Sequence, residues 1–243
     1  MRMGTEMIDI HCHLLFGVDD GADSMELSLA MIDDAVEQGI TDIILTPHYR
    51  RGMFPYDTET VKANFAELSE KAAGRDIKLY LGCEYHANSD MIEYLQNGRC
   101  LTLAETDHVL VEFSYDSAYI QVQNRLDELI SSGYIPVIAH AERYGIFEKD
   151  PDLLLQFREM GVLVQINANS ILGIDGSAIK KVCKKILKKD LADIVASDSH
   201  DLADRRSHMK ECAHYVAKKY GENTMRRLFT ANPSKIITNN TEI

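Results

Sequence analysis

The chain has 243 residues and a formal net charge of −12, with 26 lysine and arginine residues against 38 aspartate and glutamate residues. With 45% hydrophobic and 26% charged residues, its composition is typical of a folded globular protein rather than a disordered one. The acidic balance argues against nucleic acid as a partner and against a basic face lying on an anionic membrane. Taken alone, the negative charge also disfavours a phosphorylated substrate.

The N-terminal residues, the apolar runs and the cysteines indicate the cellular compartment. Residues 1–6 contain no apolar run, so we expect no signal peptide, and the longest apolar runs have strand length, so we expect no membrane insertion. The five cysteines are scattered without CxxC pairs, which disfavours a disulfide framework or a zinc ribbon. The cytoplasm is therefore the expected location.

Short apolar runs alternate with helical patterns along almost the whole chain. Residues 8–13 predict a first strand, and Asp23 and Glu26, at capping-box spacing, begin a helix that ends at Gly39. Six more strands are expected at 42–46, 77–82, 108–111, 135–139, 163–166 and 193–196. Further helices are expected around 61–72, 89–96, 120–131, 151–160, 177–189 and 207–229.

Seven strand-then-helix repeats predict an α/β fold with a parallel sheet that closes into a TIM-like barrel of seven strands. Right-handed crossovers place the C-terminal ends of all the strands on one side of the sheet. We see no linker, so residues 1–243 are expected to form one domain. The lysine-rich helix at 177–189 is interpreted as a solvated face, with docking of an acidic partner as the alternative.

Histidine and carboxylate side chains recur where these strands end. They are His11, His13, Asp20, His48, Glu84, Glu112, His140, Asp198 and His200. Carboxylates crowded together without partners would repel one another, and divalent cations remove that repulsion. Imidazole and carboxylate without thiolate favour two or three Mn, Fe or Zn ions. Cys12 lies between His11 and His13 on a strand, so it points to the opposite face and is predicted to be a core residue.

The motifs around these residues resemble those of the PHP (polymerase and histidinol phosphatase) superfamily over essentially the whole chain. Within it, the segments around Arg51 to Phe54, Glu112 to Ser114 and His140 to Tyr144 are most similar to the bacterial manganese-dependent protein-tyrosine phosphatases of the CpsB/YwqE type. The resemblance implies a distorted (β/α)7 barrel with a trinuclear centre, and it leaves residues 1–6 as an N-terminal extension.

The resemblance also implies how the ligands share three divalent ions, with manganese favoured and iron or zinc as alternatives. By position, the first ion is assigned to His11, His13, Glu84 and Asp198, the second to Glu84, Glu112 and His140, and the third to Asp20, His48 and His200.

Arginines close to these ligands are candidates for binding phosphate. The resemblance implies that Arg143 and Arg205 do so, and a guanidinium fork matches phosphate oxygens. Arg206 could exchange roles with its neighbour. Three further candidates for substrate contact are Arg50 and Arg51 after His48, and His86, which is interpreted as a supporting group or a proton donor.

The chain contains no Cys-x5-Arg thiol-phosphatase motif, no GxxxxGK[ST] loop and no GxSxG elbow. Hydrolysis of a phosphomonoester would therefore use a hydroxide bridging two metals. The resemblance implies hydrolysis of phosphotyrosine in a protein, with the Tyr-rich tail of a bacterial tyrosine kinase that controls capsule or exopolysaccharide synthesis as the substrate.

Three alternatives remain open at this point. Two of them keep the fold and change the substrate: a small-molecule phosphatase acting on a compound such as histidinol phosphate, and a phosphodiesterase. The third is a metal-stabilised docking partner of the kinase without catalysis. The sequence assigns no oligomeric state.

Overall fold

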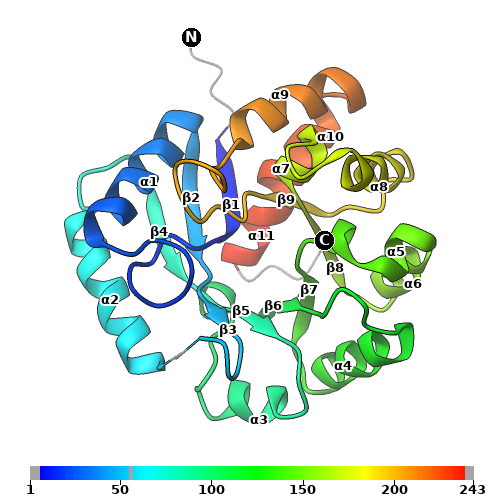
Figure 1. Cartoon of the computed structure of the whole chain (residues 1–243), viewed down its shortest axis with the longest axis horizontal. Coiled ribbons are helices and arrows are strands. Elements are labelled where there is room, and N and C mark those ends of the chain that lie inside the picture. The colour runs from blue at the N-terminus through cyan, green and yellow to red at the C-terminus, as the bar shows by residue number, and fades with distance from the viewer. Residues whose placement is uncertain (1–5, 55–56, 239–243) are drawn as a thin grey trace.

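The computed structural model describes residues 6–54 and 57–238, so the expected N-terminal extension lies outside the described residues apart from Glu6. Strands occupy the middle of the molecule and helices surround them (Figure 1). All the strand ladders are parallel, in the orders β1-β2-β4 and β3-β5-β6-β7-β8-β9. The strand segments are β1 (Met7–Cys12), β2 (Ile40–Leu45), β3 (His48–Tyr49), β4 (Lys78–Leu81), β5 (Glu84–His86), β6 (His108–Glu112), β7 (Ile135–Ile138), β8 (Leu163–Asn167) and β9 (Ile194–Ala196).

Two of the seven predicted strands, at 42–46 and 77–82, are each followed after a break by a second short strand, and these breaks distort the barrel. β2 and β3 form one strand broken at Thr46 and Pro47, where proline lacks the N–H that a ladder needs. β4 and β5 form another, broken at Gly82 and Cys83. A Cβ at Gly82 would lie 2.9 Å from the Leu103 side chain, so the chain needs glycine there to pass this neighbour. The predicted distorted (β/α)7 barrel is confirmed, with β3 and β5 extending past the breaks.

The barrel closes between β1 and β9 at their C-terminal ends. An isolated parallel bridge pairs Cys12 with Ser199. The His13 N–H donates to the Ser199 carbonyl at 2.8 Å, and the Asp198 N–H donates to the His11 carbonyl at 2.8 Å. The contacts that close the barrel therefore also fix the positions of four polar residues at that end.

The predicted helices are present in the predicted order, and short helices at Gly145–Lys149, Ala168–Leu172 and Asn232–Ile237 were not predicted. The helices are α1 (Met25–Gln38), α2 (Thr58–Lys71), α3 (Met91–Gln96), α4 (Tyr119–Ser131), α5 (Gly145–Lys149), α6 (Leu153–Glu159), α7 (Ala168–Leu172), α8 (Ser177–Lys188), α9 (Met209–Tyr220), α10 (Glu222–Arg226) and α11 (Asn232–Ile237), with short turns η1 (Leu103–Glu105), η2 (Ala141–Arg143) and η3 (Arg227–Ala231). The predicted cap at Asp23 is wrong, because α1 begins after Ser24, whose hydroxyl accepts the Leu27 N–H at 3.3 Å.

Two apolar clusters hold these layers together. The larger lies between strands and helices and includes Cys12, which confirms its prediction as a core residue. The smaller fills the barrel and includes Ile10, Ile44 and Leu110, together with Ile236 from α11. Sequence patterning did not predict α11, which packs against β1 and η1.

The lysine-rich helix α8 buries one apolar side and exposes most of its lysines. Its buried residues are Val182, Cys183, Ile186 and Leu187. This pattern confirms the predicted solvated face. Within the described ranges, no helix has the length and hydropathy that a bilayer crossing requires.

A partly buried ion pair anchors the start of β9. Asp193 is 2% exposed, and its carboxylate accepts three hydrogen bonds from the Arg158 guanidinium, at 2.7–3.1 Å, and one from the Val164 N–H at 3.0 Å. We expect Asp193→Ala to lower the free energy of unfolding by about 3 kcal/mol, because Arg158 would lose its partner. Urea unfolding at fixed metal concentration measures this loss.

The control is Lys189→Ala, which breaks the exposed pair with Asp152. That pair lies in solvent, so its loss should cost less than about 1 kcal/mol. Equal losses in the two variants would contradict the structural role given to Asp193.

Candidate metal centre

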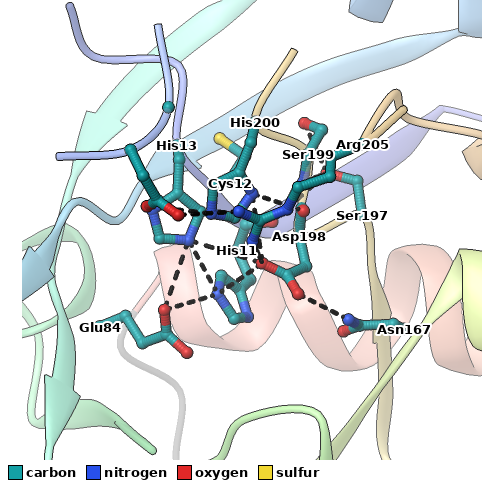
Figure 2. A network of polar contacts seen from close by, with 12 residues as sticks. His11, Cys12, His13, Glu84, Asn167, Ser197, Asp198, Ser199, His200 and Arg205 are labelled. Atoms are coloured by element: carbon teal, nitrogen blue, oxygen red, sulfur yellow. Dashed lines mark hydrogen bonds and ion pairs between the residues drawn. The ribbon is translucent and has the colours of Figure 1, made fainter. Parts of the chain in front are cut away.

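The nine candidate ligands meet at the C-terminal end of the barrel, because the strands that carry them all end there. Figure 2 shows five of them, His11, His13, Glu84, Asp198 and His200, pointing toward a common centre. They come from the ends of β1 and β9 and from β5. The others are Asp20 after β1, His48 in β3, Glu112 in β6 and His140 after β7.

Glu84 occupies the middle of this group and is fully buried. Its Oε2 atom lies 3.2 Å from His11 Nε2, 3.3 Å from His13 Nε2 and 2.8 Å from His48 Nδ1. No described residue gives Oε2 a hydrogen bond of acceptable geometry. Burial alone would raise the pKa of Glu84, but the facing imidazoles hold that pKa well below its usual value. The carboxylate is therefore charged, with one oxygen unsatisfied.

Hydrogen bonds fix which nitrogen of His11 faces the centre. The Gln165 side-chain oxygen accepts the His140 backbone N–H at 2.8 Å, which identifies that atom as the oxygen of the amide. The same oxygen lies 3.1 Å from His11 Nδ1, so Nδ1 is the donor. Burial lowers the pKa of His11, but the charges of Glu84 and Asp198 raise it overall, so the ring favours its protonated form without a metal. When the ring is neutral, as a metal ligand must be, its Nε2 lone pair points at Glu84.

His13 is oriented in the same way by a different residue. Its Nδ1 donates to Asp19 Oδ2 at 2.7 Å, which leaves the Nε2 lone pair toward the centre. The Nε2 atoms of His11 and His13 lie 3.3 Å apart, and Asp198 Oδ1 is 3.5–3.6 Å from both. Burial lowers the pKa of His13, but its carboxylate neighbours, Asp19 first, raise it well above its usual value, so a bound metal would displace a proton here. Imidazole nitrogens and carboxylate oxygens that converge in this way form the coordination environment of a cation.

A second group of ligands gathers around Asp20. Its Oδ1 atom is 3.4 Å from His48 Nε2 and 3.5 Å from His200 Nε2. His200 Nδ1 donates to the Asp198 carbonyl at 2.9 Å, and its buried Nε2 has no hydrogen-bond partner among the described residues. Burial lowers the pKa of His200 to about 4, which keeps the ring neutral and able to bind a metal.

A third group joins Glu112 to Glu84 and His48. Burial and the negative charge of Glu84 raise the pKa of Glu112, and its Oε2 atom has no hydrogen-bond partner within the described ranges. A cation between the two carboxylates would remove this repulsion. The structure places His48 in this group, whereas the resemblance assigned His140 there. His140 Nε2 instead lies 2.8 Å from the other Glu84 oxygen, Oε1.

These observations test whether the residues fit divalent metal ions. In each of three overlapping groups the ligand atoms lie within 4.8 Å of one another, and the unsatisfied atoms are all imidazole nitrogens or carboxylate oxygens. That donor chemistry suits Mn, Fe or Zn. The groups are His13, Asp20, His48 and His200; His11, His13 and Asp198; and His48, Glu84 and Glu112.

The backbone around the centre is constrained as well. His140 and Asp198 have φ values of 33° and 53°, in the left-handed region that residues other than glycine rarely adopt. A Cβ at Gly21 would lie 2.0 Å from the His13 carbonyl oxygen. Only glycine lets the loop that carries Asp19 and Asp20 pack this closely on β1.

Two arginines border the ligands. Arg143 Nη1 donates to Asp198 Oδ2 at 3.0 Å, and its Nη2 is 3.6 Å from Asp175. Although burial opposes it, the charge of Asp198 raises the pKa of Arg143, so the guanidinium stays charged. Arg205 Nη1 donates to Asp20 Oδ2 at 2.8 Å on the open side of the centre.

The remaining substrate candidates lie in different places. Arg206 pairs with Asp34 of α1, and Arg51 donates to Asp90 at 2.8 Å, so neither guanidinium faces the ligands. These two contacts argue against substrate roles for Arg206 and Arg51.

His86 and Arg50 do lie near the centre. Burial and then the charge of Arg50 lower the pKa of His86. His86 Nε2 lies 3.3 Å from the Ser114 hydroxyl. The neutral imidazole is therefore suited to hydrogen bonding rather than to pairing with an anion.

Sequence reasoning missed the residues that orient the ligands. Gln165 serves His11 and His140, and Asn167 donates to Asp198 Oδ2 at 2.8 Å (Figure 2). The signal was present, because two amides at alternate positions of a buried strand face the same side of the sheet. Asp19 also orients a ligand, but its bond to His13 depends on the packing of the loop after β1.

The chain is similar to known proteins over nearly its whole length. A family model described as "Capsular polysaccharide synthesis, CpsB/CapC" matches residues 7–238. The tyrosine-protein phosphatase CpsB of Streptococcus pneumoniae is 36% identical over 238 residues, covering 95% of this chain and 98% of the relative. The tyrosine-protein phosphatase YwqE of Bacillus subtilis is 33% identical over 237 residues, covering 97% and 93%.

Solved structures agree with this result. A structure from work on YwqE of Bacillus subtilis and CpsB of Streptococcus pneumoniae, described as metal-dependent tyrosine phosphatases, superposes with a TM-score of 0.89 at 32% identity. It covers 96% of this chain and 95% of its own. An organophosphorus hydrolase variant from Deinococcus radiodurans has a TM-score of 0.63 at 13% identity, covering 96% and 92%, and shares the fold.

A substitution at Asp19 tests whether this residue orients His13 for metal binding. Its oxygens accept from His13 Nδ1 and from the N–H groups of Gly21 and His48. Asp19→Asn replaces one acceptor oxygen with an amide NH2 group, a donor that faces these donors, so we expect Mn²⁺ affinity to fall about 10- to 100-fold. Competition with a chromogenic chelator measures this affinity. Asp23→Asn, at an exposed position in the same segment, is the control. Unchanged affinity in Asp19→Asn would refute the orienting role.

Proposed function

Because the chain belongs to the CpsB/CapC family of capsular polysaccharide synthesis, we propose that it is a metal-dependent protein-tyrosine phosphatase, a phosphoric monoester hydrolase. The observation that carries this proposal is the convergence of imidazole and carboxylate lone pairs on Glu84, with two guanidinium groups beside them. Such a centre suits the hydrolysis of an anionic ester.

The ligand set that we propose is the full group of nine, holding three divalent ions with manganese favoured. Divalent cations bound there supply positive charge to the phosphoryl oxygens and lower the pKa of water. The chain's own contribution is to hold the imidazoles in one tautomer through Gln165 and Asp19. The ligands are His11, His13, Asp20, His48, Glu84, Glu112, His140, Asp198 and His200.

Arg143 and Arg205 are proposed to bind the phosphoryl group. Arg143 is held by Asp198 and Asp175, so its remaining N–H groups are positioned before substrate arrives. The Arg205 side chain is 42% exposed and can reach the substrate from the solvent side. A planar fork binds two phosphate oxygens at once, which orients the ester.

A phosphotyrosine-containing protein is the proposed substrate, with the tail of a bacterial tyrosine kinase that controls capsule synthesis as the specific candidate. An accessible centre supports this proposal, since the Asp20 and Arg205 side chains are about four-tenths exposed. Five free, buried cysteines support the cytoplasm as the compartment. We further propose that residues 1–243 act as one domain.

The alternative substrates receive less support. A small phosphate ester such as histidinol phosphate calls for an enclosed pocket, and the ligand end is open. A phosphodiester chain calls for a basic groove leading to the centre. A basic depression of about 770 Å³ is lined by Lys184, Lys188 and Arg227. None of the candidate ligands lines it, so it does not support a phosphodiester substrate at the centre.

A comparison of three substrates tests the function. We expect kcat/KM for a phosphotyrosyl peptide to exceed the values for histidinol phosphate and for bis(p-nitrophenyl) phosphate by about 100-fold or more, because the ligands and arginines suit an exposed aryl monoester. A preference for histidinol phosphate or for the diester would overturn the proposed substrate.

The same assay includes a matched pair of arginine variants. Arg143→Ala should lower kcat/KM on the phosphotyrosyl peptide by about 100-fold, as expected for the loss of one preorganised donor. Arg206→Ala should keep its activity, because that side chain pairs with Asp34. Metal content measured in both proteins excludes an indirect effect. Equal activities of the two variants would contradict the role of Arg143.

A further inference from the structure

Strongly exposed apolar side chains gather at the end of the barrel that carries the ligands. Tyr115 is 62% exposed and Ile120 is 57% exposed, and both lie between the end of β6 and the first turn of α4. Leu155 of α6 is 45% exposed. The others of this kind at the ligand end are Met53, Ile174 and Leu202. Exposed apolar groups concentrated on one face often mark an interaction surface.

A groove of about 490 Å³ lies beside the centre, next to Tyr115 and Ile120 in the chain. Two of its lining residues follow metal ligands on adjacent strands: His86 comes two residues after Glu84, and Ser114 comes two residues after Glu112. Figure 1 places β5, β6 and α4 side by side in this region. Hydroxyl and amide side chains predominate in the lining, namely Asn88, Ser89, Ser114, Ser117, Gln121 and Asn124.

One wall of the groove is fixed by its own hydrogen bonds. Asn88 Oδ1 accepts from the Tyr85 hydroxyl at 3.2 Å and from the Asp90 N–H at 2.9 Å. Asn88 Nδ2 donates to the His86 carbonyl at 3.3 Å. The Ala87 N–H donates to the Glu112 carbonyl at 2.9 Å, which ties this wall to a metal ligand. This wall is therefore ordered before a ligand binds, which lowers the entropic cost of binding.

The opposite wall, from α4 and the turn before it, has free hydrogen-bonding groups. Within the described part of the chain, the Asn124 amide and the Ser117 hydroxyl make no side-chain hydrogen bond. An amide offers both a donor and an acceptor, which is the complement of a peptide main chain. Extended peptides bind in this way, with main-chain hydrogen bonds for affinity and side-chain contacts for specificity.

The charge of the groove excludes a polyanionic occupant. Its two oppositely charged lining side chains are Asp116 and Arg125, and Arg125 is paired with Glu128 at 2.6 Å. A groove that contains one carboxylate and one neutralised guanidinium does not attract a nucleic acid or an anionic lipid. A neutral polypeptide segment suits it.

We propose that this groove binds the main chain of an extended polypeptide segment next to the phosphotyrosine, with Tyr115 and Ile120 packing against apolar side chains of that segment. The proposal rests on the phosphatase function proposed above and names the part of the substrate that lies outside the metal centre. The phosphoryl group contacts the ligands and arginines, and the residues that flank it in the substrate contact β5, β6 and α4.

The test compares two substrates with the same ester. One is free phosphotyrosine, and the other is a dodecapeptide with phosphotyrosine between apolar residues. The readout is the ratio of kcat/KM on the peptide to kcat/KM on free phosphotyrosine, measured with the manganese-loaded full chain. In the double variant Tyr115→Ser/Ile120→Ser we expect this ratio to fall about tenfold through KM for the peptide. Asn124→Leu should lower it about fivefold through lost main-chain hydrogen bonds.

Leu155→Ser, an exposed apolar position that does not line the groove, is the matched control and should keep the wild-type ratio. If the wild type hydrolyses both substrates but neither groove variant changes the ratio, the groove proposal is overturned while the phosphatase function stands. If the wild type hydrolyses neither substrate, the proposed function fails and the groove proposal fails with it.

Discussion

The site depends on one buried carboxylate that is surrounded by imidazoles and has one oxygen that no described residue satisfies by a hydrogen bond. Three imidazole nitrogens lie within 3.3 Å of Glu84 Oε2, yet none donates to it. Gln165 and Asp19 accept the outer protons of His11 and His13, so the inner nitrogens present lone pairs once those rings are neutral. An arrangement of lone pairs facing a charged oxygen is costly in a dry interior, and a cation relieves that cost. The positions of the other ligands follow from this requirement.

The barrel explains why such a cluster can be built. Parallel strands end on one side, and the breaks at Pro47 and Gly82 let β3 and β5 continue past the regular barrel, carrying His48 and Glu84 into the centre. Closure between β1 and β9 uses the backbone of the ligand segments themselves, including His13 and Asp198. Folding and ligand placement are therefore coupled, and strained backbone at two ligands is supported by the surrounding hydrogen bonds.

The sequence was sufficient for the order of the seven main strands and the longer helices, because apolar periodicity is a local property. It was also sufficient for the convergence of the nine candidate ligands, because strand ends in a parallel sheet share one side. It was not sufficient for features that depend on contacts between residues distant in the sequence or on fine local geometry. Ser24 rather than Asp23 caps α1, α11 is too short to show a period, and the choice between Arg205 and Arg206 depends on Asp34. The pairing of Asp19 with His13 likewise exists only after the loop has folded.

The net charge of −12 now has a different meaning. Four of the carboxylates belong to the proposed ligands, and three divalent cations would more than neutralise them, so attraction for phosphate would arise only at the metal-loaded centre. The most direct measurement is elemental analysis of the protein after saturation with Mn²⁺ and removal of free metal, for the wild type and for Glu84→Gln. The account predicts two or three ions per wild-type chain and fewer in the variant. A wild-type chain that retains no metal, or a variant that retains as much as the wild type, would contradict it.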